Sequence, residues 1–372
     1  MADLRFIMIG GFLGAGKTTS IGRLATAYQD QGLRVGIVTN DQAADLVDTQ
    51  TLRSQGFRVG EVAGACFCCN FGELTDVISQ LEADQRPDIV LAEPVGSCTD
   101  LVATVVQPLK QLYKGRFDVA PYGVILKPSH GMRILGGRES SARPARSGFS
   151  PQAAYIFEKQ LEEADFVLIN RIDELPPDRV SELATLLTKH YPETPILRVS
   201  ARTGEGFDEL LETLDRQGSY GSRILELDYD RYAAGEAELG WLNCSAKMTA
   251  AAEFSLDDLV LEITKRIGAA MIQDAREIAH IKTIGQTNTA HAVANMISNA
   301  TPAELSIPAN HRTATAEIVV NARVAADPEA IEQHVRAAIK SACAAVGGNA
   351  SCGRVQSFRP GRPVPTHRFE KT

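Results

Sequence analysis

Hydrophobic residues in the first half of the chain gather in short continuous runs separated by helical patterns. Between the runs, apolar residues recur at helical spacing, as from 17 to 28 and from 180 to 187. Continuous apolar strands that alternate with helices are typical of a parallel sheet covered by helices on both faces. We therefore predict an α/β domain over 1–216. The six expected strands are at 5–9, 34–39, 88–92, 124–126, 166–169 and 195–199.

The pattern changes after a glycine-containing connector at 217–240. Apolar and polar residues now alternate over 242–249 and 316–324, which indicates half-buried strands. Shorter strands are expected at 281–284 and 352–358. Ser255 and Asp327 are typical helix starts, the latter followed by a proline. The order βαββαβ predicts a ferredoxin-like α+β domain over 241–372.

One stretch interrupts the first domain. Residues 127–151 are rich in glycine, arginine and serine and contain three prolines. Such a composition lacks the apolar periodicity of a helix or strand. We therefore expect an exposed insertion here.

Composition excludes several classes of protein. The 372 residues are 44% hydrophobic and 23% charged, as in globular proteins, which argues against a disordered or coiled-coil chain. A net charge of -8 argues against a nucleic-acid partner, and no apolar run is long enough for a membrane span. Seven cysteines, an odd number, do not suggest a disulfide framework, and the first residues lack a signal-peptide layout. We expect a cytoplasmic protein.

A phosphate-binding motif follows the first expected strand. Residues 11–18 read G-x-x-x-x-G-K-T, and a helical pattern comes directly after them. Glycines allow backbone N–H groups to point at phosphate oxygens, and the helix N-terminus adds positive charge. We expect Lys17 to bind the phosphates and the Thr18 hydroxyl to bind Mg²⁺. The expected binding residues are Gly11, Gly14, Ala15, Gly16, Lys17, Thr18 and Thr19.

A second element of the same site is predicted after the strand at 88–92. Glu93 would approach Mg²⁺ there, directly or through water. Gly96, three residues later, could place an N–H group near the γ-phosphate. The alternative is an ordinary acidic residue at a strand end. Strand, acid and phosphate loop occur in the order that favours the functional interpretation.

A base-binding site is predicted after two later strands. Asn170-Arg171-Ile172-Asp173 is similar to the guanine-reading N-K-x-D, with arginine in place of lysine. A carboxylate accepts two N–H bonds from guanine, and adenine lacks that donor pair. Ser200-Ala201 follows the next strand and resembles a second guanine-contacting element. Together these motifs favour GTP over ATP.

Three of the seven cysteines form a C-x-C-C motif at Cys66, Cys68 and Cys69. Thiolates are soft ligands that suit Zn²⁺ and Cu(I), and three sulfurs supply most of a tetrahedral shell. A structural zinc site and a redox-active thiol group are the alternatives. The remaining cysteines, Cys98, Cys244, Cys343 and Cys352, are interpreted as small buried hydrophobic residues.

The sequence resembles the CobW-type family of P-loop GTPases, which includes metallochaperones and cobalamin-associated proteins. The resemblance rests on 10–19, 66–69, 93–96 and 170–173 and spans about the first 220 residues. It implies that the C-x-C-C loop binds a transition metal, with zinc expected and cobalt or nickel as alternatives. The family's Asn-Glu pair after the second strand is Asn40-Asp41 here, so Asp41 becomes a candidate metal ligand or switch residue.

These observations lead to a GTP-driven metallochaperone as the main hypothesis. Nucleotide state would change metal affinity, and Asp45, or else Asp48, would position the attacking water. The expected partner is a metalloprotein or corrinoid-related client, and a homodimer is the candidate assembly. A regulatory GTPase that gates a metal or corrinoid enzyme is the second hypothesis. A P-loop small-molecule kinase is the third.

Overall fold

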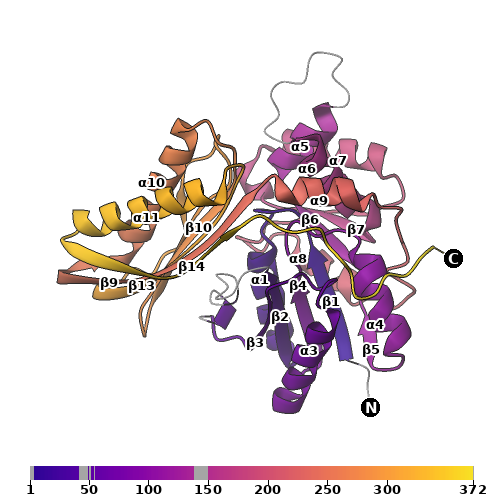
Figure 1. Cartoon of the computed structure of the whole chain (residues 1–372). Coiled ribbons are helices and arrows are strands. Elements are labelled where there is room, and N and C mark those ends of the chain that lie inside the picture. The colour runs from indigo at the N-terminus through magenta and orange to yellow at the C-terminus, as the bar shows by residue number, and fades with distance from the viewer. Residues whose placement is uncertain (1–3, 42–48, 50–51, 54, 138–149, 372) are drawn as a thin grey trace. The chain divides into compact units, whose positions relative to one another are not determined.

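The computed structural model describes residues 4–41, 49, 52–53, 55–137 and 150–371. The chain forms two compact units (Figure 1). Of the described residues, the first unit contains those up to Gly235 and, again, those from Arg362 onward, and the second unit contains Glu236–Gly361. The expectation for 241–372 assigned the last of these residues to the ferredoxin-like domain, but their contacts are with the first unit.

The first unit is built on a parallel sheet. Its strands lie in the order β3-β2-β4-β1-β6-β7-β8, and β5 pairs with β1 beside this path. All the described strand pairs of this sheet are parallel, and β1 and β4 align Arg5 with Ile89. The strands are β1 (Leu4–Gly10), β2 (Val35–Asp41), β3 (Val59–Ala63), β4 (Ile89–Glu93), β5 (Phe117–Val119), β6 (Gly123–Leu126), β7 (Phe166–Ile169) and β8 (Ile196–Arg198).

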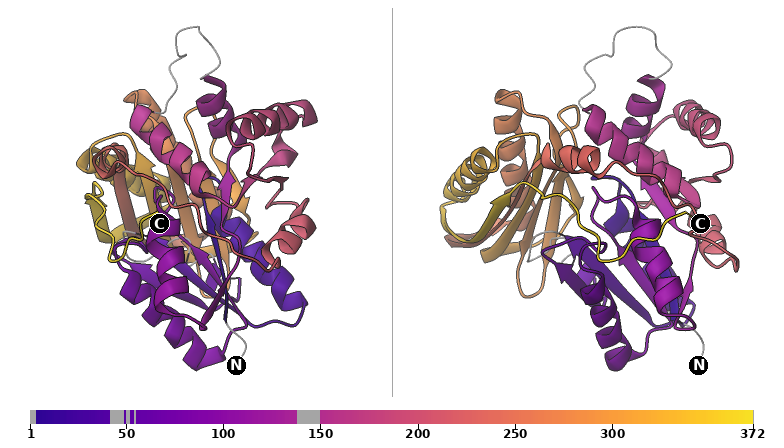
Figure 2. Two further views of the ribbon diagram at one scale, coloured as in Figure 1. Left: turned by 90° about the vertical axis from the view of Figure 1, so that its right-hand side faces the viewer. Right: turned by 45° about the vertical axis from the view of Figure 1, so that its right-hand side comes forward.

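Helices cover the two faces of this sheet (Figure 2). On one face, Ile7 and Ile9 of β1 share a buried cluster with Leu24 and Leu210 from two of the helices. The helices are α1 (Lys17–Asp30), α3 (Phe71–Gln85), α4 (Gln107–Leu112), α5 (Pro128–Gly137), α6 (Pro151–Glu163), α7 (Pro177–His190), α8 (Phe207–Leu214) and α9 (Tyr229–Ala237), with a π-helical turn at Val102–Val106 and a 3-10 turn at Ile172–Glu174. The predicted α/β class is confirmed.

The expectation of an exposed insertion is wrong for residues 127–137. After β6 ends at Leu126, residues 128–137 form the helix α5, in which Ile134 and Leu135 are buried. Gly131 of α5 lies against Leu183 of α7, where a Cβ would come within 2.8 Å of a leucine methyl group. This glycine allows two helices to pack closely, and it is not a sign of a loop. Residues 138–149 lie outside the described residues.

The second unit has the predicted ferredoxin-like order. The strands of its antiparallel sheet lie in the order β12-β11-β10-β13-β9-β14. The last four of these form the ferredoxin-like sheet, and β11 and β12 extend it at one edge. Ile263 of α10 and Val335 of α11 share one buried cluster with alternate residues of β9 and β13. The elements are β9 (Gly240–Ser255), α10 (Leu256–Gln273), β10 (Ile278–Gln286), β11 (His291–Met296), β12 (Glu304–Ile307), β13 (Arg312–Val324), α11 (Pro328–Ala345) and β14 (Gly348–Phe358). The sequence pattern did not predict β11 and β12.

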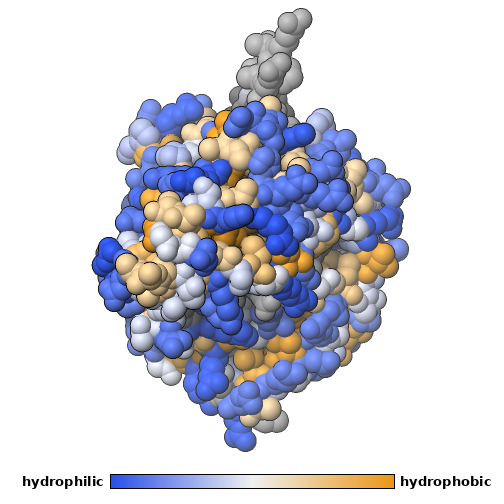
Figure 3. Space-filling view, turned by 60° about the vertical axis from the view of Figure 1, so that its left-hand side comes forward, coloured by the Kyte–Doolittle hydropathy of each residue, from blue (hydrophilic) through white to orange (hydrophobic). Residues whose placement is uncertain are grey.

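No helix in the described part of the chain is long and apolar enough to span a membrane. On the face drawn in Figure 3, hydrophilic residues predominate and apolar residues form small separate groups.

Parallel strands place their carboxyl ends at one edge of the first sheet, where α/β proteins bind ligands. The residues that follow these ends come from distant parts of the sequence. They are Gly11 after β1, the end of β2 at Asn40 and Asp41, Glu93 at the end of β4, Asn170 after β7 and Ser200 after β8. The fold thereby collects the predicted site residues from most of the first 200 residues.

Candidate functional site

The loop between β1 and α1 needs its glycines. Gly11, Gly14 and Gly16 have φ angles of 138°, 71° and 98°, in a region that other residues rarely adopt. A Cβ on Gly11 would lie 2.1 Å from the carbonyl oxygen of Ile125, and one on Gly16 would lie 2.3 Å from Nδ2 of Asn170. The loop is therefore packed closely against its neighbours and leads directly into the N-terminus of α1. Backbone N–H groups there suit an anion.

Lys17, the first residue of α1, is buried and Nζ donates to the Gly11 carbonyl oxygen at 2.9 Å. A Cβ on Gly96 would lie 2.9 Å from the same Nζ. The lysine head therefore lies between the start of the phosphate loop and the segment after β4. A phosphate held by the loop would find a cation and the backbone around Gly96 on the same side.

The Thr18 hydroxyl donates to Oε1 of Glu93 at 2.9 Å. Glu93 ends β4 and is 4% exposed, so its carboxylate is held inside the sheet edge rather than in solvent. A hydroxyl and a carboxylate oxygen are ligands that Mg²⁺ uses together with phosphate oxygens and water. The two side chains fit a magnesium ion at this edge. Thr19, next to Thr18 in α1, is exposed.

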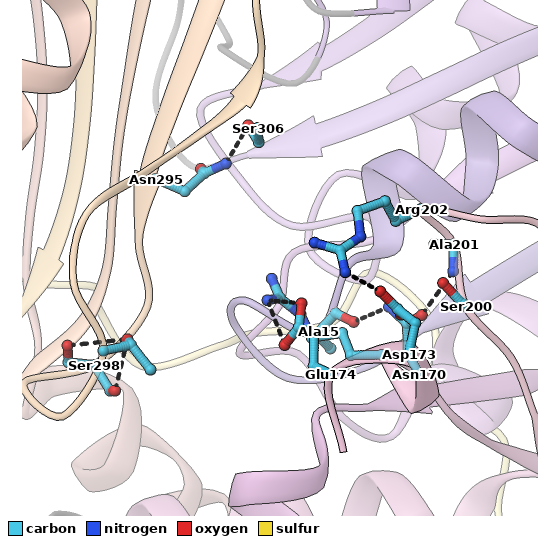
Figure 4. A network of polar contacts seen from close by, with 12 residues as sticks. Ala15, Asn170, Asp173, Glu174, Ser200, Ala201, Arg202, Asn295, Ser298 and Ser306 are labelled. Atoms are coloured by element: carbon cyan, nitrogen blue, oxygen red, sulfur yellow. Dashed lines mark hydrogen bonds and ion pairs between the residues drawn. The ribbon is translucent and has the colours of Figure 1, made fainter. Parts of the chain in front are cut away.

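Asn170 joins two loops of the site (Figure 4). Its Nδ2 donates to the carbonyl oxygen of Ala15 at 2.8 Å, and its Oδ1 accepts from the N–H of Ala201 at 2.9 Å. The side chain is 2% exposed. Asn170 therefore holds the phosphate loop and the 200–201 loop together. Its side chain positions these two loops.

Asp173 has a carboxylate that is largely buried and charged. Burial by itself would raise the pKa of Asp173, but hydrogen bonds from the side chains of Ser200 and Arg202 outweigh it and lower the pKa (Figure 4). Its Oδ1 is buried and has no hydrogen-bond partner in the described residues. An ionised carboxylate with one oxygen unoccupied is suited to N–H donors of a ligand. Arg171 has a positive φ of 61° and pairs with Glu174 at 3.1 Å.

The three thiols of the C-x-C-C motif lie together between β3 and α3. Their sulfurs are all within 4.8 Å of one another, with Cys66 at 2.8 Å from Cys68 and 3.2 Å from Cys69. The N–H groups of Cys69 and Asn70 both donate to the Cys66 carbonyl oxygen, which closes a tight turn. Three convergent sulfurs on one turn fit a soft cation such as zinc.

Asn40 holds this turn in place, a role that the sequence interpretation missed. Its Nδ2 donates to the carbonyl oxygens of Val62 and Ala65 at 2.9 and 2.7 Å, and its Oδ1 accepts from the N–H of Phe67 at 2.7 Å. Asn40 is 8% exposed and lies near the end of β2. The sequence did contain one signal for this role, because Asn40 is a polar residue that continues an apolar strand.

Protonation of the thiols is favoured in the absence of a cation. Hydrogen bonds with Cys66 are the largest cause, and they raise the pKa of Cys68 well above its usual range and that of Cys69 to about 11. A metal bound at these thiols would have to displace their protons, so its binding would release protons and strengthen with pH. Cys98 is buried as expected, but its side chain is hydrogen-bonded to Cys68.

Three further candidates are described only in part or not at all. Asp41 pairs with Ala63 through the backbone of β2 and β3, and its side chain lies outside the described residues. Asp45 and Asp48 lie outside them entirely. Of the other cysteines, Cys244 and Cys343 are buried, whereas Cys352 is partly exposed.

A family model described as "CobW/HypB/UreG, nucleotide-binding domain" matches residues 5–198. The chain belongs to this family. The resemblance to CobW-type proteins that the motifs indicated is thereby confirmed, and the matched residues include the phosphate loop, the thiol loop and Asp173.

Curated relatives are similar over part of their length. The zinc chaperone YeiR of Escherichia coli strain K12 is 29% identical over 177 residues, which are 46% of this chain and 47% of that protein. The zinc chaperone CobW of a Sinorhizobium species is 24% identical over 217 residues, 53% of this chain and 59% of that protein. The chain thus matches about half the length of these relatives.

The comparison with solved structures gives weak similarities. The zinc-bound YjiA GTPase from Escherichia coli is 13% identical, with 91% of this chain and 99% of that chain covered and a TM-score of 0.39. HypB from Helicobacter pylori in complex with nickel is 17% identical, with 59% and 93% covered and a TM-score of 0.40.

A buried carboxyl group that contacts the segment after β4 was also missed from the sequence. Glu163, at the end of α6, accepts from the Thr99 hydroxyl and the Val102 N–H, each at 3.0 Å. Burial is the main cause that raises the pKa of Glu163 to about 8. The group anchors the segment that follows Gly96, and nothing in the sequence around Glu163 distinguishes it from a surface acid.

Proposed function

We propose that this protein is a GTP-binding and GTP-hydrolysing metallochaperone that couples nucleotide state to transition-metal binding at Cys66, Cys68 and Cys69. The observation that carries the proposal is the position of the thiol turn. Asn40, near the end of β2, holds the turn through three hydrogen bonds at the sheet edge that also carries the phosphate loop. Relatives named zinc chaperones support zinc as the cargo.

The nucleotide half of the proposal rests on the phosphate loop and Asp173. Backbone N–H groups of 11–19 would hold the phosphates, with Lys17 on their outer oxygens. Mg²⁺ would neutralise phosphate charge, and the proposed ligands are Thr18 and Glu93, whose side chains are hydrogen-bonded to each other. Asp173 would accept two N–H bonds from guanine, and the stem of Arg171 would cover the base. The backbone of Ser200 and Ala201 would complete this pocket.

The metal half rests on the three sulfurs, with zinc as the preferred ion and cobalt or nickel as alternatives. Asp41 is the proposed fourth ligand or switch residue, because β2 carries it next to Asn40. The segment after it contains Asp45, the proposed residue for positioning the attacking water, and Asp48 as its alternative. The client would be a metalloprotein or corrinoid-related protein, and a second copy of the chain is a further candidate partner.

Zinc titration in three nucleotide states tests this coupling. A competing chromophoric chelator would report zinc affinity with a non-hydrolysable GTP analogue, with GDP and without nucleotide. We expect affinities that differ by about fivefold or more between states, within the usual range of coupling free energies. Cys68→Ser should weaken binding strongly, whereas Cys352→Ser, a partly exposed thiol of the second unit, should not. Equal affinity in all three states would exclude the coupling.

The rival functions predict different results. A regulatory GTPase with the thiols as a sensor would form a stable client complex without metal. A P-loop small-molecule kinase would bind ATP as tightly as GTP and would not respond to a change at Asp173. The charged Asp173 carboxylate, with its unoccupied Oδ1, favours a guanine-binding protein.

A further inference from the structure

The C-terminal segment 362–371 runs in extended form along the first unit (Figure 2). Its hydrogen bonds reach the thiol turn. The N–H of Val364 donates to Sγ of Cys69 at 3.2 Å. Thr366 donates twice, through its N–H to the Cys68 carbonyl oxygen at 2.8 Å and through its hydroxyl to the Cys69 carbonyl oxygen at 3.0 Å. This segment therefore covers both Cys68 and Cys69.

An aromatic contact adds to this docking. The ring of His367 stands edge-on to Phe71, with centroids 5.3 Å apart and an interplanar angle of 87°. Phe71 begins α3 directly after the thiol turn and is 1% exposed. The segment thus packs on the rigid element behind the turn as well as on the turn itself.

A buried ion pair pins the far end of the segment. Nε of Arg368 donates to Oδ2 of Asp100 at 2.7 Å, and the hydroxyl of Tyr229 donates to the same oxygen at 2.7 Å. The Asp100 side chain is 1% exposed. The N–H of Phe369 then donates to the Ala103 carbonyl oxygen at 3.0 Å.

This ion pair is an attachment of the segment that is costly to break. Burial raises the pKa of Asp100, while the bonds from Tyr229 and Arg368 oppose that rise. A buried carboxylate that loses its cation is left with an uncompensated charge, which is more costly than the loss of a surface pair. Release of Arg368 from Asp100 would therefore carry a free-energy cost that opposes undocking of the segment.

We propose that the segment 362–371 is a lid on the metal site, pinned by Arg368 on Asp100, which positions the Cys69 sulfur and controls exchange of the metal. Hydrogen bonds to ligand atoms fix their orientation and tune their affinity, as the Val364 N–H does here. Metal that leaves the thiols for a client, or arrives there, must do so with the lid displaced. The proposal rests on the proposed metal site, but the docking itself involves no nucleotide.

The lid is connected to the nucleotide side of the site through one short segment. Asp100 lies four residues after Gly96, and between them the Cys98 side chain is hydrogen-bonded to Cys68. Displacement of 96–100 would therefore disturb both the pin of the lid and the inner side of the thiol turn. This gives nucleotide state a physical route to metal exchange.

Two variants test the lid in the full chain. Arg368→Gln removes the pin, and Thr366→Pro removes both donors of Thr366. The control is Arg336→Gln, which breaks the ion pair with Glu332 on α11 in the other unit. The first readout is the rate at which a disulfide reagent modifies the thiols of the metal-free protein, with Cys69 followed by peptide mass analysis. We expect both lid variants to react about tenfold faster, and the control to match the parent protein.

The second readout is the rate of Zn²⁺ transfer from the loaded protein to an excess of EDTA. Both lid variants should lose zinc about tenfold faster than the parent. Rates within twofold of the control in both readouts would overturn the lid. If the parent binds no zinc at Cys68, the metallochaperone proposal fails, yet the thiol-modification readout still decides whether the segment covers the turn. The two proposals can therefore fail separately.

Discussion

Asn170 and Ala15 are 155 residues apart in the sequence, yet the amide of Asn170 donates to the Ala15 carbonyl oxygen at 2.8 Å. The bond holds the phosphate loop at a fixed distance from the segment that carries Asp173. The same side chain accepts from the N–H of Ala201. One buried amide therefore sets the geometry between the phosphate end and the base end of the candidate nucleotide site.

Asn170→Ala should weaken guanine nucleotide binding by about tenfold or more. It leaves the Ala15 carbonyl and the Ala201 N–H without their buried partner, at about 1–3 kcal/mol for each unsatisfied group. Fluorescent GDP binding would measure the affinity, and thermal unfolding would show the accompanying loss of stability. Asn349→Ala, an exposed asparagine of β14, is the matched control. Unchanged GDP affinity in Asn170→Ala would contradict the bridging role.

Asp173→Asn should shift base preference from guanine to xanthine. Xanthine carries a carbonyl where guanine carries an amino group, so an amide at 173 can pair with it where a carboxylate cannot. Competition of GTP and XTP against a labelled nucleotide would measure the shift. A variant that keeps its preference for GTP, or a parent protein that binds ATP equally well, would argue against guanine recognition.

Asn40→Ala should lower zinc affinity by 10-fold to 100-fold, the usual effect of losing a group that orients metal ligands. Three hydrogen bonds to the thiol turn disappear while all three sulfurs remain. The zinc-to-protein ratio at saturation should stay the same, which separates this effect from the loss of a ligand. Chelator competition measures the affinity. An affinity equal to the parent's would mean that the turn is rigid without Asn40.

Stability should fall as pH rises through neutrality because of Glu163. Its pKa is raised to about 8 in the folded protein, so between about 4.5 and 8 the native state holds a proton that the unfolded chain releases. From pH 6 to 8 this should reduce the free energy of unfolding by about 2 kcal/mol. Urea unfolding at both pH values measures the change. Glu163→Gln should lose this part of the pH dependence, whereas Glu162→Gln, beside it on the surface, should keep it.

Much of the fold could be predicted because its signals are local. The apolar run at 166–169 became β7 with the same limits, and the alternation at 316–324 falls within β13. The helix at 128–137 could not be predicted in the same way. Its glycines are typical of a loop. The tertiary contact of Gly131 with Leu183 shows why a glycine is suited to this helix.

The sequence by itself determined the family, the phosphate loop and the C-x-C-C thiols, because those residues are adjacent in the chain and their spacing carries the chemistry. Tertiary structure alone decided which distant residues serve them. Asn40 holds the thiol turn, Asn170 ties the phosphate loop to the base loop, and Arg368 reaches Asp100. These are long-range contacts between polar side chains, and no periodicity along the chain records them. They follow from the parallel sheet, which brings its carboxyl ends to one edge, and from the return of the chain to the first unit.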